Sequence, residues 1–338
     1  MTLWFVSTGK GKSMLRLAFA AALTFALSLA GSAFGAVYPA RPITIIVPFA
    51  AGGPADTLAR LLGQQMQKTL GQPLVVENVA GAAGTIGVGR VVRAAPDGYT
   101  IGIGHLGTNV FNGALYDLPY DLVKDLMPIA LLTSNVSVLI TKKEVPATNL
   151  RELIAWLKAN PDQATAATAG IGTVAHLATV YFEKMTGVHM TIVPYRSGAA
   201  ADTDVLAGHV TLLFDQVTGG SAQLYRSGAV KAFAVAAKSR LPSLPNIPTV
   251  DEAGLPGLYV STWYGLWAPK GTPPDVINKL NAAAEAALAD PAVHQKLAAQ
   301  EAQFPPVDET SPAALGAFQK AEIAKWWPLI KAAHIKLQ

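Results

Sequence analysis

Short apolar runs alternate with amphipathic segments along most of the chain. The first run, Ile43–Val47, is apolar at nearly every position, which is typical of a parallel strand covered on both faces. Leu58, Leu62 and Met66 then recur at helical spacing, and Pro54 ahead of them favours a helix start. The pattern therefore predicts a buried strand that passes through a short loop into an amphipathic helix.

The same succession of strand, loop and helix recurs further along the chain. Residues 73–77 predict a second strand and residues 99–104 a third, while Val88, Val91 and Val92 mark a helix between them. The alternation resumes in the middle of the sequence. Strands that alternate with helices at close spacing predict an α/β fold with a parallel sheet and right-handed crossovers.

Two apolar segments, residues 129–140 and 259–269, are longer than the other predicted strands. One leaves the first half of the chain and the other returns to it, so we expect a pair of strands that crosses between two domains. Residues 273–338 show helical spacing, and we expect them to pack on the first domain. The predicted division is a discontinuous first domain of residues 36–136 and 260–338, and a second domain of residues 137–259.

Two loops of small residues precede predicted helices and are candidate ligand sites. The first loop runs from Phe49 to Gly53, and the second, residues 170–173, ends at Thr173, which can cap the helix that follows. Amides in the first turn of a helix lack an intrahelical partner, and the helix dipole favours an anion there by about 0.3–1 kcal/mol. Either loop alone is compatible with an ordinary connection. One in each half of the chain favours a ligand held at both ends.

The first 35 residues have the pattern of a secretory signal peptide. Three basic residues precede an apolar run at residues 17–30, and small residues follow it up to Gly35. This run is shorter than the roughly 20 residues that a membrane span needs. We therefore expect export and cleavage before Ala36, with either Met1 or Met14 as the true start.

Charge and cysteine content exclude several classes of function. The leader removes three of the 26 Lys and Arg residues, so 23 basic residues remain against 22 acidic ones. A nearly neutral mature chain offers no electrostatic basis for binding nucleic acid or an anionic membrane. The absence of cysteine excludes disulfides, thiolate metal sites and cysteine nucleophiles.

The segment Gly102-Ile103-Gly104-His105-Leu106-Gly107 matches the glycine pattern of dinucleotide-binding folds. That pattern should open a helix directly and be followed about 20 residues later by an acid at the end of the next strand. Asp125 has this spacing but precedes the long apolar segment instead of ending it. We therefore expect no nucleotide and no other cofactor.

The six histidines show no spacing typical of metal ligands. His105 and His176 are the two of interest, because both follow predicted strands at the edge where open parallel sheets bind ligands. No G-x-S-x-G elbow occurs, and no catalytic Ser, His and Asp set can be singled out. The sequence thus predicts no metal site and gives no support for hydrolytic chemistry.

Several motifs together resemble the receptors of the tripartite tricarboxylate transporter family, the Bug group of periplasmic solute-binding proteins. They are YPARPI at residues 38–43, VPFAAGGPADTLAR at 47–60, VEN at 76–78, APDGYT at 95–100, VPYRSGAAADTDVLAGHVTLLFD at 193–215, and PTV with EAG at 248–254. The resemblance covers nearly all of the mature chain. It implies a type II periplasmic-binding-protein fold, with two α/β domains joined by two crossing hinge strands and a ligand cleft between them.

The resemblance also implies a ligand site built from loops of both domains. The residues carried over or adjacent are Phe49, Ala50, Gly52, Gly53, Asp56, Thr57, Asn78, His105, Thr108, Gly170, Gly172, Thr173, His176, Tyr195, Ser197, Gly198 and Asp215. Arg196 stands where many relatives have lysine, and His105 where many have a small residue. Both departures leave the identity of the ligand open, because a guanidinium or an imidazole changes the shape and the hydrogen bonding of a pocket.

We therefore expect a monomeric periplasmic receptor that captures a small organic acid, closes its domains and delivers the ligand to integral-membrane permease subunits. A dicarboxylic acid is favoured, while tricarboxylic, aromatic and amino acids stay open. The alternatives are an exported enzyme that acts on carboxylates and a sensory receptor without a transport role. No catalytic residue, cofactor or metal is expected.

Overall fold

The computed structural model describes residues 38–335. The predicted signal peptide and its cleavage point therefore lie outside the described residues. The chain divides after Ala40 into two units, and the helices and strands described below belong to the second, residues 41–338. In the described part of the chain, none of the helices combines the length and the apolar character that crossing a membrane requires.

Nine strands form a sheet in the order β2-β1-β3-β9-β4-β7-β5-β6, and β8 also pairs with β4. Their bounds are β1 Ile43–Val47, β2 Leu74–Asn78, β3 Thr100–His105, β4 Leu126–Thr141, β5 Thr165–Thr168, β6 Thr191–Pro194, β7 Leu212–Gln216, β8 Lys231–Val235 and β9 Ser261–Pro269. The neighbours of β1 are parallel to it, as are those of β5. The predicted α/β class with parallel pairing is confirmed, while β4 and β9 add antiparallel pairs.

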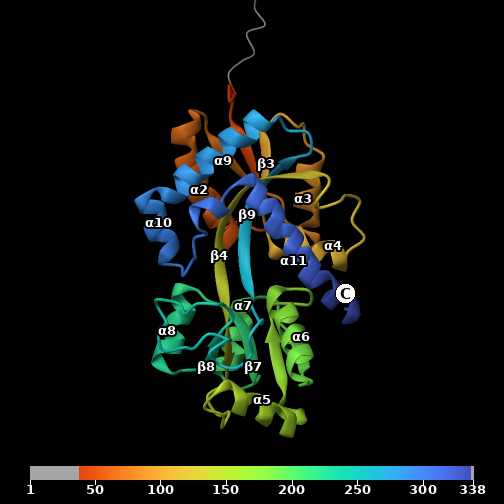
Figure 1. The fold of residues 1–338 in the computed structure, drawn as a ribbon, viewed down its shortest axis with the longest axis vertical. Coiled ribbons are helices and arrows are strands. Elements are labelled where there is room, and N and C mark those ends of the chain that lie inside the picture. The colour runs from red at the N-terminus through yellow and green to blue at the C-terminus, as the bar shows by residue number, and fades with distance from the viewer. Residues whose placement is uncertain (1–37, 336–338) are drawn as a thin grey trace, which may run out of the picture. The chain divides into compact units, whose positions relative to one another are not determined.

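The two long apolar segments of the sequence are the central strands β4 and β9, which run side by side through the structure (Figure 1). From Leu126 to Val136, β4 pairs with β9, and from Ser137 to Thr141 it pairs with β7 and β8. We call β1 to β3 the first half of the sheet and β5 to β8 the second half. The change of partners falls where the sequence predicts a domain boundary, and the division into two domains stays a prediction.

The longer helices are α2 Pro54–Leu70, α3 Thr85–Val92, α5 Leu150–Ala159, α6 Val174–Thr186, α7 Gly198–Leu206, α8 Gly219–Ser227, α9 Pro274–Ala289, α10 Pro291–Ala298 and α11 Pro312–Ala332. The shorter turns are η2 Ala82–Gly84, η3 Gly107–Phe111, α4 Asn112–Leu115, η4 Pro161–Gln163 and η5 Val307–Glu309. In the second half, α5 and α6 belong to one apolar cluster, and α7 and α8 to another.

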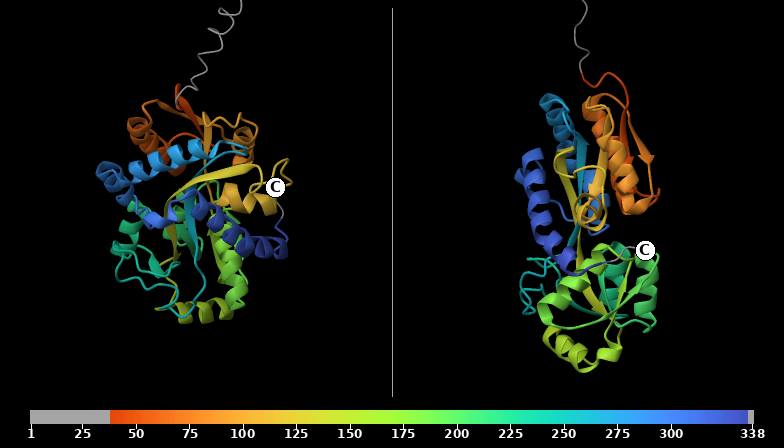
Figure 2. Two further views of the ribbon diagram at one scale, coloured as in Figure 1. Left: turned by 45° about the horizontal axis from the view of Figure 1, so that its top comes forward. Right: turned by 90° about the vertical axis from the view of Figure 1, so that its right-hand side faces the viewer.

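Among the C-terminal helices, α9 packs on α2 and β4, and α11 lies alongside β4 and η3 (Figure 2). Gln319 Nε2 donates to Asn109 O at 2.9 Å, and Trp327 Nε1 donates to Val110 O at 2.8 Å. Trp263 and Trp326 are fully buried, and both indole N–H groups donate to Glu322. Burial of each such large apolar side chain contributes about 1.5–3 kcal/mol relative to exposure.

The three glycines of the apparent dinucleotide fingerprint have packing roles. A Cβ on Gly102 would lie 2.6 Å from Val91 Cγ2, and one on Gly104 would overlap Asn109 Oδ1. A Cβ on Gly107 would lie 2.6 Å from Cε1 of His105. Each glycine thus makes room for a named neighbour, and a π-type turn, η3, follows the strand in place of the regular helix that a nucleotide site requires.

Candidate functional site

The first loop, residues 49–53, follows Pro48 and connects β1 to α2, and its middle is exposed. Ala50, Ala51 and Gly52 are exposed, and Gly53 occupies the N-cap position of α2 without a side chain to cap the first turn. Pro54 follows at the first helical position. Apart from the Gly52 amide, which donates to Asp56, this arrangement leaves backbone amides of the loop and the helix start available to a negatively charged group.

Asp56 and Asn78 hold the first loop in place. The Asp56 carboxylate, 3% exposed, accepts from Gly52 N at 2.9 Å, from Arg60 Nε at 3.0 Å and from Asn78 Nδ2 at 2.9 Å. Asn78 Nδ2 also donates to Phe49 O at 3.1 Å. The Arg60 guanidinium, with these other donors, holds the pKa of Asp56 at about 2. Both side chains were predicted to contact ligand, but in the structure their polar atoms bind the loop and Arg60.

His105 ends β3 with its ring beside the first loop. Its Nδ1 accepts from Thr108 N at 3.1 Å, and its ring centroid lies 4.7 Å from that of Phe49 and 5.9 Å from that of Tyr264. Burial lowers the pKa of His105 to about 4, so the ring is neutral at neutral pH. Thr108, predicted as a ligand contact, is 1% exposed, and its hydroxyl donates to Asn109 Oδ1 at 2.7 Å.

The second loop, residues 170–173, leads into α6, and the predicted N-cap is confirmed. Thr173 Oγ1 accepts from His176 N at 3.5 Å and donates to Gly170 O at 2.7 Å. Gly172 N donates to His176 Nδ1 at 2.9 Å, and burial lowers the pKa of His176. Gly170 and Gly172 have φ values of 121° and 79°, which L side chains rarely adopt.

The loop of residues 195–198 leads into α7 in the same half of the sheet. Ser197 caps this helix by accepting from Ala200 N at 3.3 Å, and Gly198 is its first residue. The Tyr195 hydroxyl donates to Asp204 Oδ2 at 2.6 Å, and burial raises the pKa of Tyr195 to about 12. Of the candidates in this loop, the exposed Ser197 and the partly exposed Gly198 present the start of a helix to solvent.

Asp215, near the end of β7, is 7% exposed and faces α7 and α8. It accepts from the Tyr225 hydroxyl and interacts with Asp202 of α7. Burial raises the pKa of Asp215, and burial together with the Asp215 carboxylate raises the pKa of Asp202 to about 7. Sequence reasoning missed Asp202, although its place between the buried residues Ala201 and Val205 of one helix was a signal that it faces inward.

The structure links the candidates of the first half to the end of β7 through Tyr264. Tyr264 is paired with His105 in the register of β9 with β3, and the Gln216 side chain of β7 lies close enough to influence the pKa of Tyr264. Sequence reasoning missed Tyr264 and Gln216, which carry no local signal, and Arg60, whose position four residues after Asp56 on a predicted helix was one. Among residues 38–335, no hydrogen bond or ring contact joins the first loop directly to residues 170–173.

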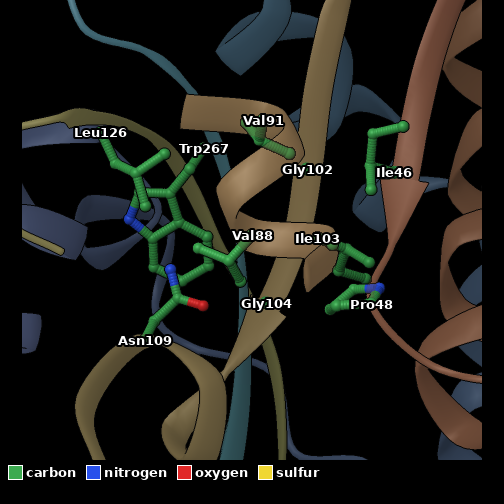
Figure 3. A pocket seen from close by; sticks show the side chains of 11 residues that line it. Ile46, Pro48, Val88, Val91, Gly102, Ile103, Gly104, Asn109, Leu126 and Trp267 are labelled. Atoms are coloured by element: carbon green, nitrogen blue, oxygen red, sulfur yellow. The ribbon is translucent and has the colours of Figure 1, made fainter. Parts of the chain in front are cut away.

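Two cavities lie near these residues, and neither is lined by residues 49–53. A cavity of about 10 Å³ lies between β1, α3, β3 and β9 and is lined by side chains such as Ile103 and Trp267 (Figure 3). It is at the lower limit for one water molecule. A groove of about 480 Å³ runs beside α6, lined by His176, Glu183, Lys184 and residues after α11. The described residues contain no group of three or more acidic or histidine side chains that could hold a metal ion.

Comparison with known proteins gives these loops a context. The sequence profile described as "Tripartite tricarboxylate transporter family receptor" matches residues 58–335. BugT of Bordetella pertussis is 36% identical over 303 residues, which cover 89% of this chain and 92% of BugT.

Two solved structures from Rhodopseudomonas palustris are also similar. MatC, solved with bound malate, is 39% identical and covers 87% of this chain with all of its own length, at a TM-score of 0.74. A second protein, solved with adipate, is 32% identical, covers 88% of this chain and 99% of itself, and has a TM-score of 0.75. These matches confirm the predicted type II periplasmic-binding-protein fold. The chain therefore belongs to the receptor family of the tripartite tricarboxylate transporters, the Bug-type periplasmic solute-binding proteins.

Proposed function

We propose that this protein binds a small dicarboxylic acid between the two halves of its sheet and delivers it to permease subunits in the membrane. The observation that carries the proposal is the first loop, whose exposed backbone is held by the buried carboxylate of Asp56 together with Asn78 and Arg60. Two relatives that are at least 32% identical hold dicarboxylic acids, malate and adipate. A dicarboxylic acid has a carboxylate at each end, which fits one helix start in each half of the sheet.

In this proposal one carboxylate lies against residues 49–53 and the start of α2. The second lies against the loop of residues 170–173 or the start of α7, where Thr173 and Ser197 complete the turns. Each hydrogen bond to a charged ligand contributes about 1.5–3 kcal/mol. A few such bonds, less the cost of ordering the site, give an affinity near micromolar, which corresponds to about −8 kcal/mol.

Asp56 supports this site without contacting the ligand. Its charge would repel a carboxylate, but the guanidinium of Arg60 lies 2.9 Å from Oδ1 and offsets that charge. The Asp56 carboxylate also orients the amide of Gly52, because Gly52 N donates to it. Asp56, Asn78 and Arg60 therefore act as positioning residues for the loop.

Domain closure is the step that we propose for delivery. The two halves of the sheet would move as domains about β4 and β9, near residues 136 and 260, and the closed liganded form would be the one that the permease recognises. We further propose that the mature protein acts in the periplasm as a monomer and carries out no chemistry on its ligand.

A ligand screen tests the proposal. The mature protein, residues 36–338, is heated with malate, adipate, succinate, citrate, benzoate and aspartate in turn, and the melting temperature is recorded. A ligand at 100 times its dissociation constant stabilises the fold by about 2.7 kcal/mol, which gives a clear shift. Titration calorimetry should then give one site, and recovered ligand should be unaltered. A chemically altered acid would indicate an enzyme, and no shift with any acid would refute the proposed ligand class.

Closure has its own measurement. Small-angle X-ray scattering of the mature protein, with and without the stabilising acid, should show a smaller radius of gyration in the liganded sample. An unchanged radius with a saturating ligand would show that binding occurs without domain movement. The same data give the molecular mass and hence test the monomer.

A further inference from the structure

We propose that His105 is a specificity-determining residue that offers the ligand a neutral N–H donor from Nε2. This inference deepens the proposed function and rests on it. The partner of that donor must be an oxygen of the ligand, such as a carboxylate or hydroxyl oxygen. An ammonium group at the same place would meet a second donor. The site would therefore accept simple or hydroxylated dicarboxylic acids and reject amino acids that place their amine against His105.

The hydrogen bond to Nδ1 determines which ring nitrogen carries the proton. Thr108 N donates to Nδ1 at 3.1 Å, so Nδ1 is an acceptor and has no hydrogen of its own. A neutral imidazole with an unprotonated Nδ1 carries its hydrogen on Nε2. The low pKa that burial gives this ring supports the neutral form at neutral pH. His105 therefore presents a donor, and no acceptor, at its outer nitrogen.

The Nε2 atom is free to meet a ligand. It makes no hydrogen bond to any residue between 38 and 335. Within that part of the chain, the fully buried side-chain polar atom that lacks a partner is Asp202 Oδ1, so Nε2 of the largely buried His105 ring keeps some exposed surface. A donor that is fixed, unpaired and accessible is suited to recognise an acceptor on another molecule.

The ring is held firmly enough to discriminate between ligands. It lies between Phe49 of the first loop and Tyr264 of β9, with centroid distances of 4.7 and 5.9 Å. It also folds over Gly107, where a Cβ would come within 2.6 Å of Cε1. Phe49 is adjacent in the chain to the exposed residues Ala50 to Gly52, so the His105 ring packs directly against the loop of the proposed carboxylate site.

Two substitutions separate the roles of the two ring nitrogens. In His105→Asn, the amide oxygen can take the place of Nδ1 and accept from Thr108 N, but the outer donor is lost. In His105→Gln, the longer amide can place an N–H near the position of Nε2, but the acceptor for Thr108 N is lost. A recognition role predicts that the Asn variant binds the acid about 10- to 100-fold more weakly. The Gln variant should stay within a few fold of wild type.

The experiment measures dissociation constants by titration calorimetry for malate, succinate and aspartate with wild type and both variants. His189→Asn, at an exposed histidine outside the proposed site, is the control and should bind as wild type does. Wild type should prefer malate or succinate to aspartate by at least about 10-fold, and His105→Asn should reduce that preference. Melting temperatures establish that each variant is folded. If His105→Asn does not fold, Gly107→Ala serves instead, because its added Cβ displaces the ring.

The outcomes distinguish this inference from the proposed function. If wild type binds none of the acids, both fail. If wild type binds an acid and His105→Asn binds it equally well, only the role of His105 is overturned. Loss of binding in His105→Gln with retention in His105→Asn would also overturn it, because that pattern would assign His105 to bracing the turn of Thr108.

Discussion

Asp202 of α7 and Asp215 of β7 hold their carboxyl groups against each other, with the Tyr225 hydroxyl donating to Asp215 from the other side. Two neighbouring carboxylates in a buried place repel each other, so the pair retains a proton near neutral pH. Ser221 and the backbone of Gln216 provide the other hydrogen bonds to Asp215. Oδ1 of Asp202 is buried and unpartnered in the described part of the chain.

This pair predicts a pH dependence of stability. The pKa of Asp202 is raised from 3.8 to about 7, so between those values the folded protein holds a proton that the unfolded chain has released. Stability therefore falls as pH rises from about 4 to 7. Asp202→Asn removes this loss. The melting temperature of the variant minus that of wild type should therefore increase as pH rises from about 4 to 7 and stay constant above pH 7.

Calorimetric melting temperatures from pH 4.5 to 8.5 test this expectation. Asp162→Asn, at an exposed aspartate of η4, serves as the control and should follow wild type throughout. A difference between Asp202→Asn and wild type that does not vary with pH would contradict proton retention by the pair.

The hydrogen bonds to the buried carboxylate of Asp56 predict a second effect on stability. Asp56→Asn removes the charge that Gly52 N, Asn78 and Arg60 all contact, and should destabilise the fold by about 2 kcal/mol. Because the pKa of Asp56 is lowered to about 2, its contribution is present above pH 3.8 and is lost as pH falls through 2. Urea unfolding at pH 7 and pH 3 measures the difference.

Glu77→Gln is the matched control for that substitution. Glu77 also pairs with an arginine, Arg90, but the two side chains are 41% and 49% exposed. An exposed pair contributes only about 0–1 kcal/mol. Equal losses in Asp56→Asn and Glu77→Gln would mean that the hydrogen bonds to the buried Asp56 carboxylate do not stabilise the first loop.

Two glycines of the proposed site predict different responses to substitution. Gly53 has φ −80° and its nearest neighbour to a new Cβ is Ala50 O at 3.7 Å, so Gly53→Leu should fold normally. Its side chain would cover the exposed loop and weaken binding of the stabilising acid by at least about 10-fold. Gly172, at φ 79°, should tolerate no side chain without losing about 1–2 kcal/mol of stability.

Melting temperatures and dissociation constants are measured together for these variants. Ala282→Leu, at an exposed position of α9, is the control for adding a leucine to the surface. A folded Gly53→Leu protein with wild-type affinity would remove the first loop from the site.

Asn135 joins the second half of the sheet to the C-terminal region by two hydrogen bonds, and its loss should lower the free energy of unfolding. Its Nδ2 donates to Val217 O at 3.2 Å and to Gln300 O at 2.9 Å, and the residue is 8% exposed. Asn135→Ala leaves the buried carbonyl of Val217 and the carbonyl of Gln300 without this donor and should cost about 1–3 kcal/mol. Urea unfolding checks the loss, and a change below 0.5 kcal/mol, a typical value for a surface substitution, would show that water replaces the amide.

Local pattern was enough to predict much of the fold. The strand at Ile43–Val47, the helix that Pro54 begins and the Thr173 cap follow from periodicity, proline geometry and a hydroxyl placed three residues before an amide. The two long apolar runs proved to be β4 and β9 because residues covered on both faces of a sheet are apolar at successive positions. The motifs at residues 38–60 and 193–215 were specific enough to indicate the family.

The roles of individual polar side chains were decided by the tertiary structure alone. Asp56 follows a glycine loop in the sequence, but Asn78, 22 residues away, and Arg60 turn its carboxylate into a buried brace. Asp202 and Asp215 become a proton-sharing pair only because α7 packs on β7. The His105 ring carries its hydrogen on Nε2 because Thr108 N donates to Nδ1, while Phe49 and Tyr264 pack on the ring. Periodicity records which face of an element is buried, whereas charge and protonation depend on the partners and on the loss of water that folding brings to each group.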